Sequence, residues 1–215
     1  MLDFNLTRLL LWLPAVIIAL TFHEYAHARV ADKLGDPTAR HMGRMSLNPL
    51  VHLDPLGFIL LLVAGFGWAK PVPVNPLNIR GDRLKGMMLI SAAGPLMNIF
   101  VAFSAALVLN FALPDPQMLY SNAPLVQIMW ALVIINVYLA LFNLIPVPPL
   151  DGSKVLAGLL GSDEILYKLE RYSMIILLVL IFSGFIGMVL FPLADVVIGF
   201  LNNLAGLIAS PFVGF

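Results

Sequence analysis

Residues 21–30 read TFHEYAHARV and close an apolar run that begins at Leu9. Residues 9–30 have the length of a membrane-spanning helix, which needs ~20 mostly apolar residues. His23 lies fourteen residues after Leu9, or ~21 Å along a helix, inside a hydrocarbon core ~30 Å thick. Ionisable side chains at that depth cost several kcal/mol unless they have partners. The group His23, Glu24 and His27 therefore indicates a functional site.

The composition predicts a polytopic membrane protein embedded in a lipid bilayer. Of the 215 residues, 60% are hydrophobic and 11% are charged, against about 45–50% and about 25% in soluble domains. Twelve basic and twelve acidic residues give a formal net charge of zero, which argues against nucleic-acid binding. Since cysteine is absent, His, Asp and Glu are the strong zinc ligands that remain.

Four segments are long and apolar enough to span a bilayer: residues 9–30, 87–113, 125–145 and 172–193. Two shorter apolar stretches are more difficult to assign. Residues 56–69 suit a re-entrant or interfacial hairpin. Residues 196–208 form either a fifth, short helix or a helix in the interface. We expect a single domain over residues 1–215, with a core at 8–152 and C-terminal helices at 153–215.

Basic residues in the loops predict the orientation. Residues 33–85 contain seven Lys or Arg residues, residues 114–124 contain none, and residues 154–171 contain three. The positive-inside rule places the first and third connections in the cytosol. We therefore expect an extracytoplasmic N-terminus and a His-Glu-His motif in the cytosolic third of the bilayer.

The stretch HEYAH over residues 23–27 matches the pattern H-E-x-x-H. On a helix, residues i and i+4 share a face, so His23 and His27 can bind one zinc ion. Glu24 lies beside them and can take a proton from water activated by the metal. The pattern predicts a hydrolytic zinc site.

A catalytic zinc usually takes three protein ligands. Candidates for the third on the cytosolic side are Asp32, Asp36, Asp54, Asp82, Asp151, His41 and His52. Asp151 is favoured because the prolines in NLIPVPPL, residues 143–150, prevent a continuous helix. Non-helical backbone at membrane depth persists only beside a protein-lined or water-filled cavity. His41 and His52 are more typical of loop hydrogen bonding, because no residue pairs with them at ligand spacing.

Three motifs follow one another along the chain: His23-Glu24-x-x-His27, Gly94-Pro95-x-x-Asn98, and Asn143-x-x-Pro146-x-Pro148-x-Leu150-Asp151-Gly152. In order and spacing they resemble the site-2 protease family of intramembrane zinc metalloproteases. The resemblance covers residues 23–152. No PDZ-like domain interrupts this core, so the chain resembles the short form of the family.

The resemblance implies a set of roles: His23, His27 and Asp151 as ligands of one Zn²⁺ per chain, Glu24 as general base, and Asn143 near the substrate peptide. It also implies cleavage of membrane-protein substrates inside the bilayer. Their transmembrane segment must be locally unwound, because the carbonyls of an intact helix are hydrogen-bonded. The sequence gives no indication of oligomeric state.

The expected fold is an all-α polytopic membrane protein with a three-helix catalytic core and one or two C-terminal helices. Prolines alternate in KPVPVNP, residues 70–76, which predicts a short membrane-associated extended or β element in the first cytosolic loop. In the family, such an element is thought to hold substrate as an added strand.

The roles of two asparagines in the predicted spans can each be interpreted in two ways. Asn98 lies on a ridge of small residues and serves either helix packing or the zinc site. The broken backbone after Asn143 favours a functional role over a helix cap. Two other functional classes compete with a protease: a metal or ion transporter, and a non-proteolytic membrane-binding module. The presence of Glu24 argues against both.

A reporter fused after Gly81 should behave as cytosolic, and one inserted after Asp115 as external, because the loop charges set the orientation. Alkaline phosphatase and green fluorescent protein fusions would measure this. The opposite pair of results would overturn the predicted depth and side of the motif.

Overall fold

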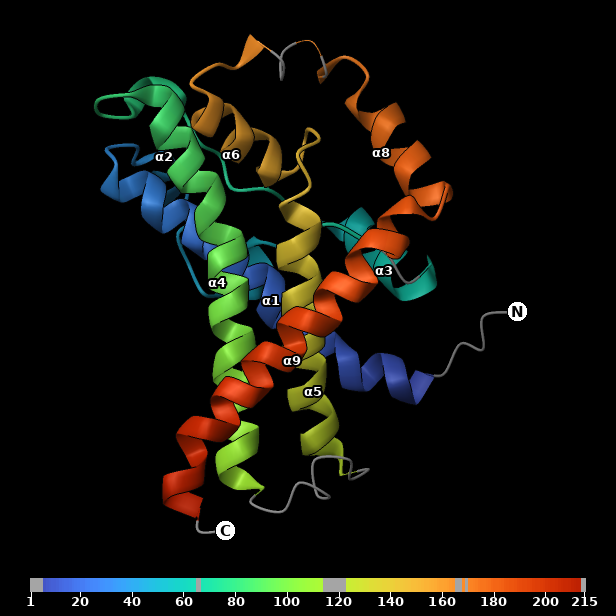
Figure 1. The fold of residues 1–215 in the computed structure, drawn as a ribbon. Helices are drawn as coiled ribbons and strands as arrows, with labels where there is room; N and C mark the ends of the chain where they lie inside the picture. The colour runs from blue at the N-terminus through green and yellow to red at the C-terminus, as the bar shows by residue number, and fades with distance from the viewer. Residues whose placement is uncertain (1–5, 65–66, 114–122, 165–167, 169, 214–215) are drawn as a thin grey trace.

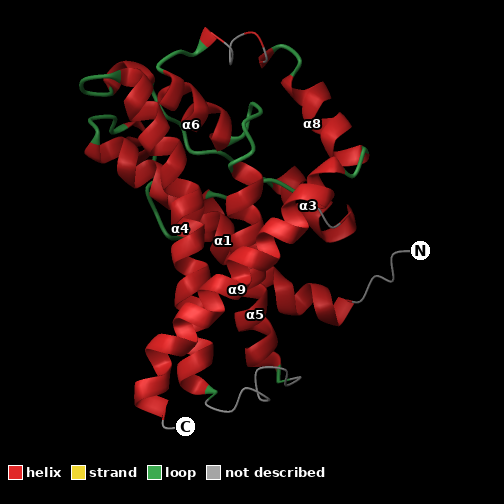
Figure 2. Ribbon diagram, in the orientation of Figure 1, coloured by secondary structure: helices red, strands yellow, loops and turns green. Residues whose placement is uncertain are grey.

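The computed structural model describes residues 6–64, 67–113, 123–164, 168 and 170–213. Within these ranges the chain is helical and contains no β-strand (Figure 1; Figure 2). The elements in order are α1 (Leu6–Lys33), α2 (Thr38–His41), the 3-10 turn η1 (Pro49–Val51), α3 (Pro55–Ala64), the 3-10 turn η2 (Pro76–Asn78), α4 (Arg83–Ala112), α5 (Pro124–Asn143), α6 (Asp151–Leu160), α8 (Ser173–Phe182) and α9 (Phe185–Val213). The all-α prediction is confirmed.

Among the described residues, three helices are long and apolar enough to cross a membrane: α4, α5 and α9. The first two agree with the predicted spans at 87–113 and 125–145. The predicted first span at 9–30 lies within α1, whose 28 residues include a proline at position 14. Residues 114–122, the predicted external connection, lie outside the described part of the chain.

The prediction of one span over residues 172–193 is wrong, because α8 ends at Phe182 and α9 begins at Phe185. Gly184 between them has a φ of 74°. This left-handed conformation suits glycine and is common just after a helix end. The undecided stretch at 196–208 belongs to the 29-residue helix α9.

α4 is the central helix of the bundle and contacts α1, α5, α6 and α9. Figure 1 shows α9 crossing α4 and α5. The predicted ridge on α4 is buried: Ser91, Gly94, Asn98, Ala102 and Ala105. Small side chains let helix backbones approach closely, and Ala15 of α1 and Ala205 of α9 accordingly share a buried cluster with Ala105.

The first loop folds back on itself, as predicted for residues 56–69. An isolated antiparallel bridge joins Leu53 to Ala69, and a Cβ on Gly57 would collide with the Trp68 backbone. Among the described residues, β-type pairing is limited to this bridge. Residues 70–75 continue without helix or strand, and Asn75 at their end has an extended backbone. The predicted element is therefore not a β-strand in the structure.

Asp36 ties the two ends of this loop together. Its fully buried carboxylate accepts hydrogen bonds from Thr38, from the Asn75 N–H at 2.7 Å and from the Asn78 amide at 2.9 Å. Burial alone would raise the pKa of Asp36, but these hydrogen bonds lower it below its ordinary value. Asp36 is therefore ionised at neutral pH and fixes residues 75–78 beside the end of α1.

Asp36→Ala should lower the free energy of unfolding by about 2–3 kcal/mol at neutral pH, because hydrogen bonds to a charged group are lost. The folded-state pKa is depressed, so this stabilisation is lost as pH falls through it, and the two proteins should converge in strong acid. Thermal unfolding in detergent would measure both effects. Asp163→Ala, at an exposed site, is the control, and equal stability of Asp36→Ala and wild type would contradict the role.

Candidate metal centre

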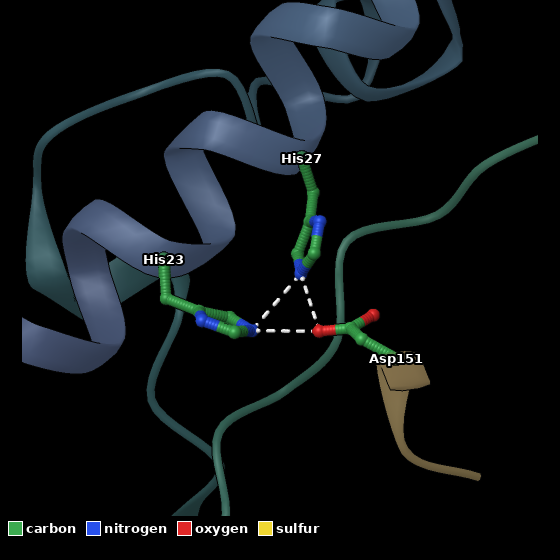
Figure 3. A group of neighbouring side chains, drawn as sticks. All are labelled: His23, His27 and Asp151. Atoms are coloured by element: carbon green, nitrogen blue, oxygen red, sulfur yellow. Dashed lines mark hydrogen bonds and ion pairs between the residues drawn. The ribbon is translucent and has the colours of Figure 1, made fainter. Parts of the chain in front are cut away.

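Three side chains from two helices meet at one point (Figure 3). His23 and His27 lie one turn apart on α1, and Asp151 is the first residue of α6. Oδ2 of Asp151 lies 3.2 Å from Nε2 of each histidine, and the two Nε2 atoms are 2.9 Å apart. The side chains are only 6%, 10% and 12% exposed. The cluster is therefore enclosed by protein.

The opposite nitrogen of each imidazole has an acceptor as its partner. Nδ1 of His23 lies 2.6 Å from Oδ1 of Asn98, and Nδ1 of His27 lies 2.7 Å from the Ile90 carbonyl oxygen. A carbonyl oxygen can only accept, so both Nδ1 atoms carry the proton and donate it. Each Nε2 then presents a lone pair to the Asp151 carboxylate.

When both imidazoles are neutral, three acceptor atoms therefore face one another with no hydrogen among them. A cation would stabilise such an arrangement, and nitrogen and oxygen ligands suit zinc. Ligand atoms on a tetrahedral zinc with bonds of about 2.0–2.1 Å lie about 3.3 Å apart. The observed separations of 2.9 and 3.2 Å are close to that spacing, and the outer hydrogen bonds are those that zinc-binding histidines normally make.

Asn98 is held in the orientation that His23 requires. Its Nδ2 donates to the Ala19 carbonyl at 3.0 Å and to Oδ1 of Asn136 at 2.8 Å, so its Oδ1 faces the histidine. Asn136 in turn donates to the Leu132 carbonyl at 2.8 Å. Both asparagines are 0% exposed. Asn98 therefore joins α1, α4 and α5 and also contacts the cluster of His23, His27 and Asp151 through His23.

Sequence reasoning did not single out Asn136. The available signal was an amide within an otherwise apolar span, which requires a hydrogen-bond partner. Its partner Asn98 lies 38 residues away on another helix, so the pairing depends on how α4 packs against α5.

Gly94 leaves room for the two imidazoles. A Cβ at this position would lie 2.5 Å from Nε2 of His27 and 2.6 Å from Cε1 of His23. No side chain fits there while both histidines keep their places. The motif Gly94-Pro95-x-x-Asn98 thus combines a space for the ligands with a hydrogen-bond acceptor one turn later.

The proline-containing connection brings Asp151 to the histidines. α5 ends at Asn143, and residues 144–150 form turns before α6 starts at Asp151. A Cβ on the next residue, Gly152, would collide with the carbonyl oxygen of Leu144. The connection therefore packs tightly against the start of α6, which explains the Asp-Gly pair.

The other candidates for the third ligand lie outside the cluster formed by the described residues: Asp32, Asp36, Asp54, Asp82, His41 and His52. Asp54 and Asp82 accept hydrogen bonds from backbone N–H groups at the starts of α3 and α4. His52 donates to the Ser46 carbonyl at 2.7 Å, the hydrogen bonding expected of a loop histidine. Asp151 is the acid that meets the histidine pair.

The cluster opens into a cavity of about 710 Å³. Its lining is mainly apolar and comes from residues 67–74 and from the helices α1, α4, α5, α6 and α8. Glu24 lines it, is 8% exposed, and accepts a hydrogen bond from the Val72 N–H at 2.8 Å. Asn143 also lines it, with its Nδ2 donating to the Leu139 carbonyl at 3.0 Å. A carboxylate and an amide therefore lie beside the cluster.

Comparisons with known proteins agree with this geometry. The model of "Peptidase family M50" matches residues 111–186. The chain is 42% identical over 184 residues to the protein named "Putative zinc metalloprotease YwhC" of Bacillus subtilis, covering 84% of each chain. It is 34% identical over 159 residues to "Putative zinc metalloprotease MJ0611" of Methanocaldococcus jannaschii, covering 72% of this chain and 73% of that one.

A more distant relative is "Putative zinc metalloprotease Rip2" of Mycobacterium tuberculosis, at 28% identity over 173 residues, 76% of this chain and 63% of that one. No solved structure gives a significant match. The expected resemblance is confirmed by the first two relatives, which match the chain over most of their length. The chain belongs to peptidase family M50, the site-2 protease family.

Proposed function

We propose that this protein is an intramembrane zinc endopeptidase that hydrolyses peptide bonds within transmembrane segments of other membrane proteins. The observation that carries the proposal is the cluster of His23, His27 and Asp151, with three acceptor atoms at zinc-ligand spacing. Glu24 lies in the same cavity. We assign the three cluster residues as ligands of one zinc per chain and Glu24 as general base.

Zinc bound there supplies a Lewis acid that polarises a carbonyl and acidifies water. Glu24 accepts a proton from the attacking water as its oxygen bonds to the scissile carbonyl carbon. It then gives that proton to the leaving amine as the C–N bond breaks. His23 and His27 keep their ring orientation through their Nδ1 hydrogen bonds during these steps.

The cavity fits a peptide chain rather than a small polar molecule. Its volume of about 710 Å³ and its mainly apolar lining suit an extended stretch of hydrophobic residues. Asn143 offers an amide to the backbone of such a peptide. We expect helix-breaking residues near the bond that is cut, because an intact helix keeps its carbonyls hydrogen-bonded.

We place the site in the cytosolic third of the bilayer, with the N-terminus outside the cytosol, on the basis of the loop charges. We treat residues 1–215 as one protease domain, since the ligands come from α1 and α6 and both helices contact α4. The family and the three membrane-length helices identify an integral membrane protein.

Each cluster residue should be required for metal binding. Purified wild type should hold about one zinc per chain, and His23→Ala, His27→Ala and Asp151→Ala should each lose it, because a catalytic site has only three protein ligands. Elemental analysis of dialysed protein would measure this. His41→Ala, at an exposed histidine, is the matched control. A full zinc content in Asp151→Ala would remove this residue from the ligand set.

Glu24→Gln should separate an enzyme from a transporter or a binding module. The amide keeps the size and the acceptor oxygen of the side chain but is not basic, so zinc should stay bound. The rate should fall on the order of 10²–10⁴-fold, the usual contribution of a general base. Cleavage of a helix-destabilised transmembrane segment in liposomes would report it.

Wild-type turnover by Glu24→Gln would refute the role of Glu24. A wild-type protein that binds zinc but cleaves no such segment would instead favour the membrane-binding module. Zinc flux into liposomes without cleavage would favour the transporter.

A further inference from the structure

Residues 70–75 form an extended segment held at both ends. The Lys70 N–H donates to the His52 carbonyl at 2.8 Å, and the buried Arg44 donates to the Lys70 carbonyl at 2.6 Å. At the other end, the Asn75 N–H donates to Asp36 at 2.7 Å. The segment is therefore a fixed part of the cavity wall.

The middle of this segment contacts the proposed base. The Val72 N–H donates to Oε2 of Glu24 at 2.8 Å, and no other described residue forms a hydrogen bond with that carboxylate. Pro71 and Pro73 have no N–H, so Val72 supplies the single backbone donor of residues 71–73. Prolines on both sides also fix the local backbone in an extended conformation.

We propose that the main-chain amide of Val72 is the positioning group for Glu24. It holds Oε2, so that Oε1 is left to exchange a proton with water and the leaving amine. The inference rests on the proposed function, because it assumes that Glu24 is the base. A buried carboxylate with one charge-assisted hydrogen bond keeps one orientation, and a base must be held close to the reacting geometry to be effective.

The N–H of Val74 serves as a control for the N–H of Val72 within the same segment. Because Pro73 has no N–H, Val74 supplies the next backbone donor along the segment, and Val72 and Val74 both line the cavity. The Val74 N–H has no hydrogen-bond partner among the described residues. If the segment acted only as a pairing edge for substrate, loss of either amide would weaken substrate binding.

Val72→Pro removes the N–H and adds a proline to a segment that is already extended. We expect kcat to fall ~10- to 100-fold, as for loss of a charge-assisted hydrogen bond. KM should change less than about twofold because the binding surface is kept. Zinc should remain at one per chain. Val72→Ala keeps the N–H, so its kcat should fall far less than that of Val72→Pro. The same is expected of Val74→Pro, which removes the unpaired N–H.

Amide hydrogen exchange tests the contact without activity or metal. Because Pro71 and Pro73 have no amide hydrogen, any exchange within residues 71–73 is that of Val72. In zinc-free protein without substrate, Glu24→Ala should speed this exchange at least about tenfold. Glu24→Gln should keep it slow, because the amide oxygen still accepts.

Equal exchange in wild type and Glu24→Ala overturns the proposal. So does an unchanged kcat in Val72→Pro, and so does an equal rise of KM in Val72→Pro and Val74→Pro, which would assign the segment to substrate pairing alone. Failure of the proposed function looks different: wild type then cleaves nothing, even though the exchange of Val72 still depends on Glu24.

Discussion

The constraint on which the rest of the site depends is the meeting of three buried acceptor atoms, from His23, His27 and Asp151. Facing lone pairs and a carboxylate repel one another where the dielectric is low, and a divalent cation turns that repulsion into attraction. Each neutral imidazole uses its one N–H for the outward hydrogen bond, so its Nε2 carries no hydrogen that could relieve the repulsion. Binding of the proposed metal would therefore be coupled to the stability of this region.

One face of α4 serves both histidines. Ile90, Gly94 and Asn98 are spaced by four residues and so lie on one face of the helix. The Ile90 carbonyl accepts a hydrogen bond from His27, and the amide oxygen of Asn98 accepts one from His23. Gly94 between them leaves room for the two rings. α1 can follow this face only because a glycine stands at its centre. The same small-residue packing that lets membrane helices approach closely thus also fixes the ring orientations of His23 and His27.

Sequence patterns predicted the parts of the site that local geometry determines. The i, i+4 spacing brings His23 and His27 together in any helix. The prolines before Asp151 prevent a continuous helix, which predicted a cavity beside this residue without knowledge of the packing. Asn136 and the amide of Val72 were missed, since each acts through a partner that only the tertiary fold brings near. The span predicted at 172–193 failed because hydropathy does not register the left-handed turn at Gly184.

In the proposed mechanism, metal binding and proton transfer depend on different parts of the chain. The proposed ligands come from α1 and α6 and are oriented by α4. Glu24 instead contacts residues 70–75, which Asp36 and Arg44 tie into the first loop. Glu24 shares a helix turn with His23, so without a separate contact its carboxylate would be free to rotate away or to join the cluster. The main-chain amide of Val72 prevents both. A backbone donor between two prolines has no side-chain rotamers to order, so the orientation of the base follows from the course of the loop and not from the packing of the metal ligands.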